Sequence, residues 1–235
     1  MRRLVLLLIF ALAACDIAPP APPVSATRPG PPPLSPQTAA ANFDAVAKAV
    51  GPQARRECRN RTSGMNCDFR ILVDPNTRAP VNAYQTVDKQ GRPLIIFTLS
   101  MIATARNADE LAFVMSHEAA HHIRSHLQRQ SQNAAAGAII FGQLAGLTGG
   151  GSAAVEAAQQ LGATVGARSY SKEFELEADQ LGTVITHNAG YNPLIGVKFF
   201  DRIPDPGDRF LGTHPPNAQR VQIVRQTARQ LGVTQ

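Results

Sequence analysis

The string HEAAH at residues 117–121 constrains what this chain can fold into more than any other feature of the sequence. Large apolar residues surround it: Leu111, Phe113, Val114, Met115 and Ile123. Asn107, with Glu110 three residues later, resembles a capping box and predicts a helix from about Ala108 to Gln130. Such a helix should be buried, and two buried histidines need polar partners.

The spacing within this string predicts a metal site. Residues four apart on a helix lie only ~40° apart around its axis, so His117 and His121 share one face. Glu118 lies ~60–100° around the axis, beside that face. Two imidazoles with a carboxylate beside them are typical of a zinc site with a general base. We therefore expect one Zn²⁺ per chain; the alternative is a pair of core histidines satisfied by hydrogen bonds.

A third ligand should come from another element, because catalytic zinc usually takes three protein ligands and keeps one position for water. The segment EFELEAD at residues 173–179 lies on a second predicted helix. Glu175 and Asp179 share a face there, so Glu175 is the candidate ligand and Asp179 the candidate acceptor for a ligand imidazole N–H. Glu173 and Glu177 are expected on the opposite, solvated face.

His122 and His126 form a second pair four residues apart. On one continuous helix they would project ~140–180° away from His117. We interpret both as packing or hydrogen-bonding residues, with a second metal pair as the alternative.

The two motifs together resemble those of the HtpX and BepA type of zinc metallopeptidase family, which also includes the CAAX prenyl proteases. The segment THPPNAQR at residues 213–220 is similar to the family's T-H-P-P-x-x-x-R element, and the strand around residues 82–84 resembles its edge strand beside the cleft. The resemblance implies a zincin-type minimal metallopeptidase domain of the α+β class, mostly helical, with a small sheet. It also implies that His214 and Arg220 lie at the active site.

The resemblance further implies a mechanism. Zinc on His117, His121 and Glu175 would activate water, with Glu118 as the base. Arg220 would stabilise the oxyanion. His214 would either do the same or act as a removable fourth zinc ligand. The alternatives are a surface arginine in the first turn of the last helix and a helix-entry histidine.

The N-terminus predicts export and a lipid anchor. Two arginines precede an apolar run that ends in small residues before Cys15, which resembles a bacterial lipobox. We expect a signal peptide at residues 1–14, a lipidated Cys15 followed by a proline-rich tether at 15–38, and the metallopeptidase domain at 39–235. An ordinary secretory signal is the alternative.

These features place the protein in the cell envelope as a periplasm-facing lipoprotein, held to the membrane through Cys15, with the inner or outer membrane left open. The chain carries a net charge of +6, but its basic residues are scattered, so a nucleic-acid partner is not expected. Cys58 and Cys67 are expected to form a disulfide in that oxidising compartment, with free thiols as the alternative. The family's long hydrophobic helices are missing from the sequence, which favours the soluble periplasmic branch and argues against prenylated substrates.

The remaining sequence predicts strands at residues 69–73, 81–87 and 94–99, and helices at about 171–188, 193–202 and 217–231. The Ala/Gly-rich stretch at 134–166 predicts a tightly packed helical hairpin. Alternatively, that stretch dips into a membrane or binds envelope protein partners.

The expected function is that of a zinc-dependent endopeptidase acting on polypeptide substrates, namely misfolded or unassembled envelope proteins. The alternatives are a zinc-holding, chaperone-like lipoprotein with vestigial peptidase activity and a structural assembly lipoprotein. Glu118 argues against the chaperone-like alternative, because a purely structural zinc site needs no base.

Overall fold

The computed structural model describes residues 33–169, 171–204 and 215–234. The expected signal peptide, Cys15 and His214 lie outside these residues. The secondary-structure elements, in chain order, are α1 (Pro36–Arg61), β1 (Arg70–Asp74), β2 (Ala83–Val87), β3 (Pro93–Thr98), α2 (Leu99–Thr104), α3 (Ala108–Ile123), α4 (His126–Leu147), α5 (Ser152–Ser169), α6 (Ser171–Asn188), α7 (Pro193–Gly196), the 3₁₀ helix η1 (Val197–Asp201) and α8 (Asn217–Gln230). The expected mostly helical α+β class with a small sheet is confirmed.

The three strands form a mixed sheet in the order β1-β3-β2. β1 runs parallel to β3, and β2 runs antiparallel to it. The central strand β3 buries Ile95 and Phe97 completely, as expected of a strand covered on one face. Since β2 pairs with β3 on one side, it is an edge strand of this sheet.

Helix α1 was not predicted from the sequence. Its apolar stripe is nevertheless regular, because Val46, Val50, Ala54 and Cys58 are four residues apart and all buried. The Ser35 side chain caps the helix by accepting a hydrogen bond from the backbone N–H of Thr38 at 3.1 Å. The helix begins at Pro36, before the residue at which the folded domain was expected to start.

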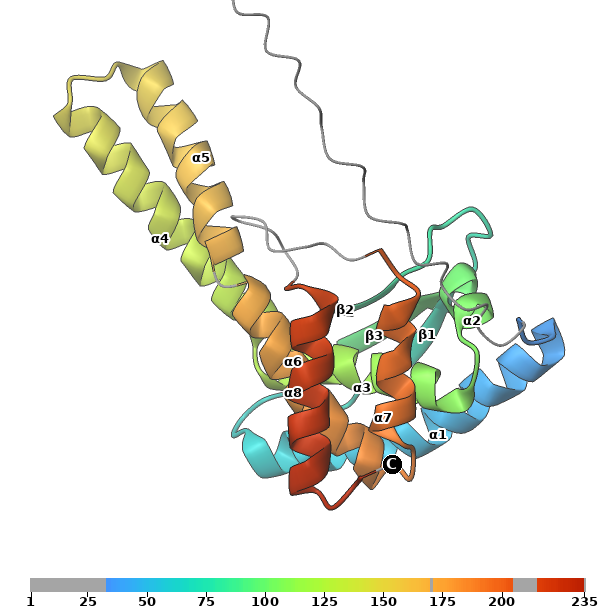
Figure 1. The fold of residues 1–235 in the computed structure, drawn as a ribbon. Coiled ribbons are helices and arrows are strands. Elements are labelled where there is room, and N and C mark those ends of the chain that lie inside the picture. Colours follow the sequence, from blue (N-terminus) through green and yellow to red (C-terminus); the bar gives the residue numbers. More distant parts are fainter. Residues whose placement is uncertain (1–32, 170, 205–214, 235) are drawn as a thin grey trace, which may run out of the picture. The chain divides into compact units, whose positions relative to one another are not determined.

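Helix α3 is the centre of the fold and packs against α1, α6, α7 and the sheet (Figure 1). The predicted cap is present, since the Asn107 side chain accepts a hydrogen bond from the backbone N–H of Glu110 at 2.9 Å. Glu110 is itself buried, and its carboxylate pairs with Arg202 at the end of η1. This ion pair fixes the first turn of α3 against the segment that follows α7.

The predicted helix from Ala108 to Gln130 is wrong at one point. Helix α3 ends at Ile123, because Ser125 adopts the left-handed conformation (φ 57°, ψ 33°), and a new helix starts at His126. A non-glycine residue in that region costs roughly 1–2 kcal/mol. Side chains after Ser125 therefore no longer follow the periodicity of α3.

The Ala/Gly-rich stretch forms the predicted hairpin, in which α4 and α5 lie side by side (Figure 1). A Cβ atom added to Gly137 would lie 2.1 Å from the carbonyl oxygen of Gly162, so these glycines permit a very close crossing. The outward apolar side chains are exposed, with Leu147 at 85%. Among the described residues, none of the helices has the length and apolar character needed to cross a membrane.

Cys58, near the end of α1, and Cys67, before β1, form a disulfide with their Cα atoms 5.8 Å apart. His122 of α3 contacts the loop that this bridge closes, since its Nε2 lies 2.8 Å from the Asn66 carbonyl oxygen. The bridge therefore holds α1, β1 and the end of α3 together.

We expect the double variant Cys58→Ser, Cys67→Ser to lose ~2–3 kcal/mol of unfolding free energy, because the unfolded chain regains the closure entropy of a short loop. Urea unfolding measures the difference, and the oxidised wild type treated with reductant is the control. Two alkylatable thiols in wild-type protein prepared without reductant would contradict the prediction.

Candidate metal centre

Three side chains from α3 and α6 direct ligand atoms at one point. The Nε2 atoms of His117 and His121 are 3.0 Å apart. The two Glu175 oxygens lie 3.4 Å from these nitrogens, one from each. Four-coordinate zinc with bonds of 2.0–2.1 Å keeps its ligand atoms ~3.3 Å apart, so the spacing fits this metal. No other group of three metal-binding side chains converges in this way among the described residues.

The protonation of the two imidazoles also fits a cation site. Burial alone would lower the pKa of His117, but its hydrogen bonds to Asp179 and Glu175 raise that pKa to about 10. Burial and the charge of His117 hold the pKa of His121 well below its usual value. Both nitrogens must present lone pairs to a metal, so zinc would replace the proton that His117 otherwise holds.

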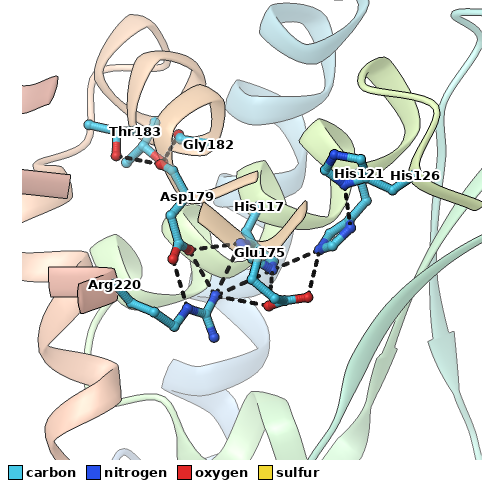
Figure 2. A network of polar contacts seen from close by, with 9 residues as sticks. His117, His121, His126, Glu175, Asp179, Gly182, Thr183 and Arg220 are labelled. Carbon is cyan, nitrogen blue, oxygen red and sulfur yellow. Dashed lines mark hydrogen bonds and ion pairs between the residues drawn. The ribbon is translucent and has the colours of Figure 1, made fainter. Parts of the chain in front are cut away.

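Asp179 orients His117, the first candidate ligand. Its Oδ1 lies 2.9 Å from Nδ1 of His117, which leaves Nε2 free for the metal. Asp179 is fully buried and is neutralised by Arg220, whose Nε and Nη2 donate to its two oxygens at 2.7 and 2.8 Å. Figure 2 shows the Arg220–Asp179–His117 chain beside Glu175.

Gly182 explains why α6 approaches α3 so closely at this point. A Cβ atom added to Gly182 would lie 3.0 Å from the backbone nitrogen of His117. Glu175 and Asp179 lie on the same face of α6, seven and three residues earlier, so the contact at Gly182 sets their distance from the imidazoles.

Glu118 lies beside the metal-binding group in a cavity of about 530 Å³. The cavity is lined by residues 81–85 around the edge strand β2, by α3 and by η1. The pKa of Glu118 is raised to about 7, mainly by burial; the charge of His117 opposes the rise, Glu175 adds to it, and Arg220 also opposes it. The backbone of Gln85 also donates a hydrogen bond to this carboxylate. A carboxyl group with such a pKa suits proton transfer near neutral pH.

Only 6% of Arg220 is exposed, which excludes the alternative of a surface arginine. Its guanidinium covers the Phe200 ring at 3.9 Å, and its Nη2 also lies 3.4 Å from Glu175. The carboxylates of Asp179 and Glu175 raise its pKa, although burial alone would lower it. Arg220 therefore braces the side chains that hold the centre.

The structure corrects the expectations for two residues near His121, namely His126 and Glu177. The expectation that His126 points away from the ligands is wrong, because the break at Ser125 turns it toward His121, with the two Nδ1 atoms 2.9 Å apart. The expectation that Glu177 is solvated is also wrong, because it is half-buried and pairs with His126 and Arg129. The HxxxxH spacing of His121 and His126 was visible in the sequence, but the break was not.

The structure thus brings together His117, Glu118, His121, Glu175, Asp179 and Arg220. The Cys58–Cys67 bridge is separate from this group, and Glu173 is exposed as expected. His214 and Cys15 lie outside the described part of the chain.

Comparison with known proteins yields two findings. The sequence pattern of Peptidase family M48 matches residues 66–228, which include every side chain of the centre. A protein of Vibrio cholerae serotype O1 (strain ATCC 39315 / El Tor Inaba N16961), named as a beta-barrel assembly-enhancing protease, is 33% identical over 143 residues. That similarity covers 54% of this chain and 29% of the relative.

We expect Gly182→Ala to lower zinc affinity about tenfold, because α6 must move a few tenths of an ångström from His117 and misplaces two carboxylates. Competition with a chromophoric chelator measures the affinity. Gln180→Ala, on the exposed face of α6, is the matched control and should bind zinc as the wild type does. Wild-type affinity in the Gly182→Ala protein would show that the close approach does not set the ligand geometry.

Proposed function

Since the chain belongs to Peptidase family M48, we propose that it is a zinc-dependent endopeptidase of the bacterial cell envelope that cleaves misfolded or unassembled envelope proteins. The observation that carries this proposal is the position of Glu118. It lies in an open cavity beside three convergent ligand atoms, where a structural metal site would need no carboxylic acid.

In the proposed reaction, the metal and the protein side chains have different roles. Zinc bound by His117, His121 and Glu175 would supply Lewis acidity, which activates water and polarises a carbonyl. Glu118 accepts the proton of the attacking water and passes it to the leaving amine. Asp179 keeps the His117 ring in the tautomer that offers Nε2 to the cation.

The cavity supports a polypeptide substrate. The edge strand β2 forms one wall, and among the described residues no strand pairs with its outer side, so an extended peptide can pair there beside the Gln85 N–H that donates to Glu118. Val81, Phe199 and Phe200 provide apolar contacts along the same cavity. Unfolded or unassembled proteins expose such extended, apolar segments, whereas folded proteins mostly do not.

The proposal also gives roles to Arg220 and His214, and the support for the two residues differs. Arg220 lines the cavity, so it can donate to a developing oxyanion while it braces Asp179 and Glu175. His214 immediately precedes the described segment that leads into α8. For His214 we keep both roles, a removable fourth zinc ligand and an oxyanion donor.

The cellular setting is part of the same proposal. The lipobox-like sequence at Cys15 and the proline-rich tether support a periplasm-facing lipoprotein. A disulfide between Cys58 and Cys67 suits that oxidising compartment. Envelope protein partners could dock on the exposed α4–α5 hairpin. The relative's name links that protein to beta-barrel assembly, which agrees with this setting.

The competing function is a zinc-holding, chaperone-like lipoprotein with vestigial peptidase activity. Its supporting observation is the apolar cavity beside β2, which could hold an unfolded segment without cleaving it. The pKa of Glu118 favours the peptidase, since binding alone gives this acid no role.

We expect wild-type protein to contain about one zinc per chain and to cleave an unfolded protein substrate. Glu118→Gln should keep the zinc and lose at least ~10²-fold in turnover, because it removes the base and not a ligand. Glu175→Ala should lose zinc. Elemental analysis and a fluorogenic casein assay measure both properties. Bound but uncleaved substrate with wild-type protein would support the chaperone-like alternative. Full zinc content in the Glu175→Ala protein would contradict the assignment of Glu175 as the third ligand.

We also expect kcat/KM to fall at acidic pH. Glu118 works as a base only when deprotonated, and its pKa is raised to about 7. A bound cation lowers that pKa, so the acid limb should lie at or below about pH 7, with activity rising as pH rises through it. Zinc content must be measured at each pH, because loss of metal would imitate the limb. A kcat/KM that is constant from pH 5 to 8 would contradict this role.

A further inference from the structure

We propose that His126 is a positioning residue for the metal centre, which orients His121 through a hydrogen-bonded chain that continues to Glu177 and Arg129. The inference rests on the proposed zinc site, because it assigns His121 as a ligand. It adds a second support to that site, which involves α4 as well as α6, the helix that carries the His117 partner Asp179.

The hydrogen bonds allow only one consistent arrangement of protons. Nε2 of His121 faces His117 and Glu175, so in a zinc complex its proton must be on Nδ1. That Nδ1–H donates to Nδ1 of His126, 2.9 Å away. His126 then carries its own proton on Nε2, which donates to Oε2 of Glu177 at 3.1 Å. Figure 2 shows His126 behind His121, on the side away from Glu175.

The position of His126 is itself closely fixed. Only 4% of the residue is exposed, and its ring stacks on Phe174, with centroids 4.7 Å apart and an interplanar angle of 8°. Arg129 covers the same Phe174 ring at 4.2 Å and donates two hydrogen bonds to Glu177, at 2.6 and 3.2 Å. The chain therefore joins α3, which carries His121, to the first turn of α4 and to α6.

The helix break at Ser125 is what places His126 against His121. His126 comes nine positions after His117, so a continuous helix would place the two on opposite faces. The left-handed residue turns α4 so that His126 comes back against His121. Strain of this kind persists where the surrounding contacts demand it, and the stacked and ion-paired His126 supplies those contacts.

Each ligand imidazole thus has its own acceptor. His117 uses a buried carboxylate directly, whereas His121 uses a neutral imidazole that is backed by a half-buried carboxylate. Groups behind metal ligands typically change metal affinity by ~10- to 100-fold when removed, because they fix the ligand's tautomer and raise its basicity. We expect an effect of this size from His126.

The test uses the full folded chain, stripped of metal and titrated with zinc against a chromophoric chelator. His126→Phe keeps the ring on Phe174 and removes both nitrogens, so zinc affinity should fall ~10- to 100-fold. Glu177→Gln should give a smaller loss in the same direction, because its amide still accepts a hydrogen bond from His126. Glu173→Gln, a carboxylate on the exposed face of α6, is the matched control and should bind zinc as the wild type does.

Cobalt substitution adds a measurement that general destabilisation does not change. The visible absorption of Co²⁺-loaded protein reports ligand geometry, and it should shift in His126→Phe but not in Glu173→Gln. The thermal midpoints of the metal-free proteins should agree, which separates positioning from folding. In the double variant His126→Phe, Glu177→Gln the affinity loss should equal that of His126→Phe alone, because both act through one chain.

The outcomes separate this inference from the proposed function. Wild-type protein that binds no zinc would overturn the metal centre and this inference with it. If the wild type binds zinc and His126→Phe matches it in affinity and cobalt spectrum, only the inference is overturned. If His126→Phe does not fold, Glu177→Gln decides, and an affinity equal to that of Glu173→Gln refutes the chain.

Discussion

The buried contact between His117 on α3 and Asp179 on α6 is the interaction on which the site depends. It places a carboxylate with no exposed surface against an imidazole, which is unfavourable unless both are paired. Arg220 from α8 provides the balancing charge. Three helices distant in sequence are thereby held in one relative position, and Gly182 makes that position sterically possible. The cavity and the edge strand β2 are then arranged around this junction.

Much of this could be predicted from the sequence because the signals are local. HEAAH and EFELEAD are short strings whose side chains keep fixed angles on a helix, so His117, His121, Glu175 and Asp179 could be assigned roles from spacing. The same holds for the Asn107 cap and the hairpin glycines. The three strands were also found close to their observed positions, since alternating apolar residues between turns identify them.

The structural features that could not be predicted from the sequence depend on tertiary contacts. No local sequence rule places Ser125 in the left-handed conformation, so the helix break and the inward position of His126 could not be foreseen. Glu177 looked solvated because its partners, Arg129 and His126, lie on α4, which comes earlier in the chain and was assigned a different direction. Helix α1 was overlooked for another reason, since it follows a proline-rich segment and contains Pro52 itself.

The α4–α5 hairpin has a consequence for how the site assembles during folding. It separates His121 from Glu175 by a segment of about 50 residues, and closing a flexible loop of that length costs ~3.5 kcal/mol in chain entropy. The close crossing of Gly137 and Gly162 makes the hairpin a local, two-helix unit whose contacts form between near neighbours. Once it has formed, its two ends already lie together, and α3 and α6 meet as though joined by a short connection.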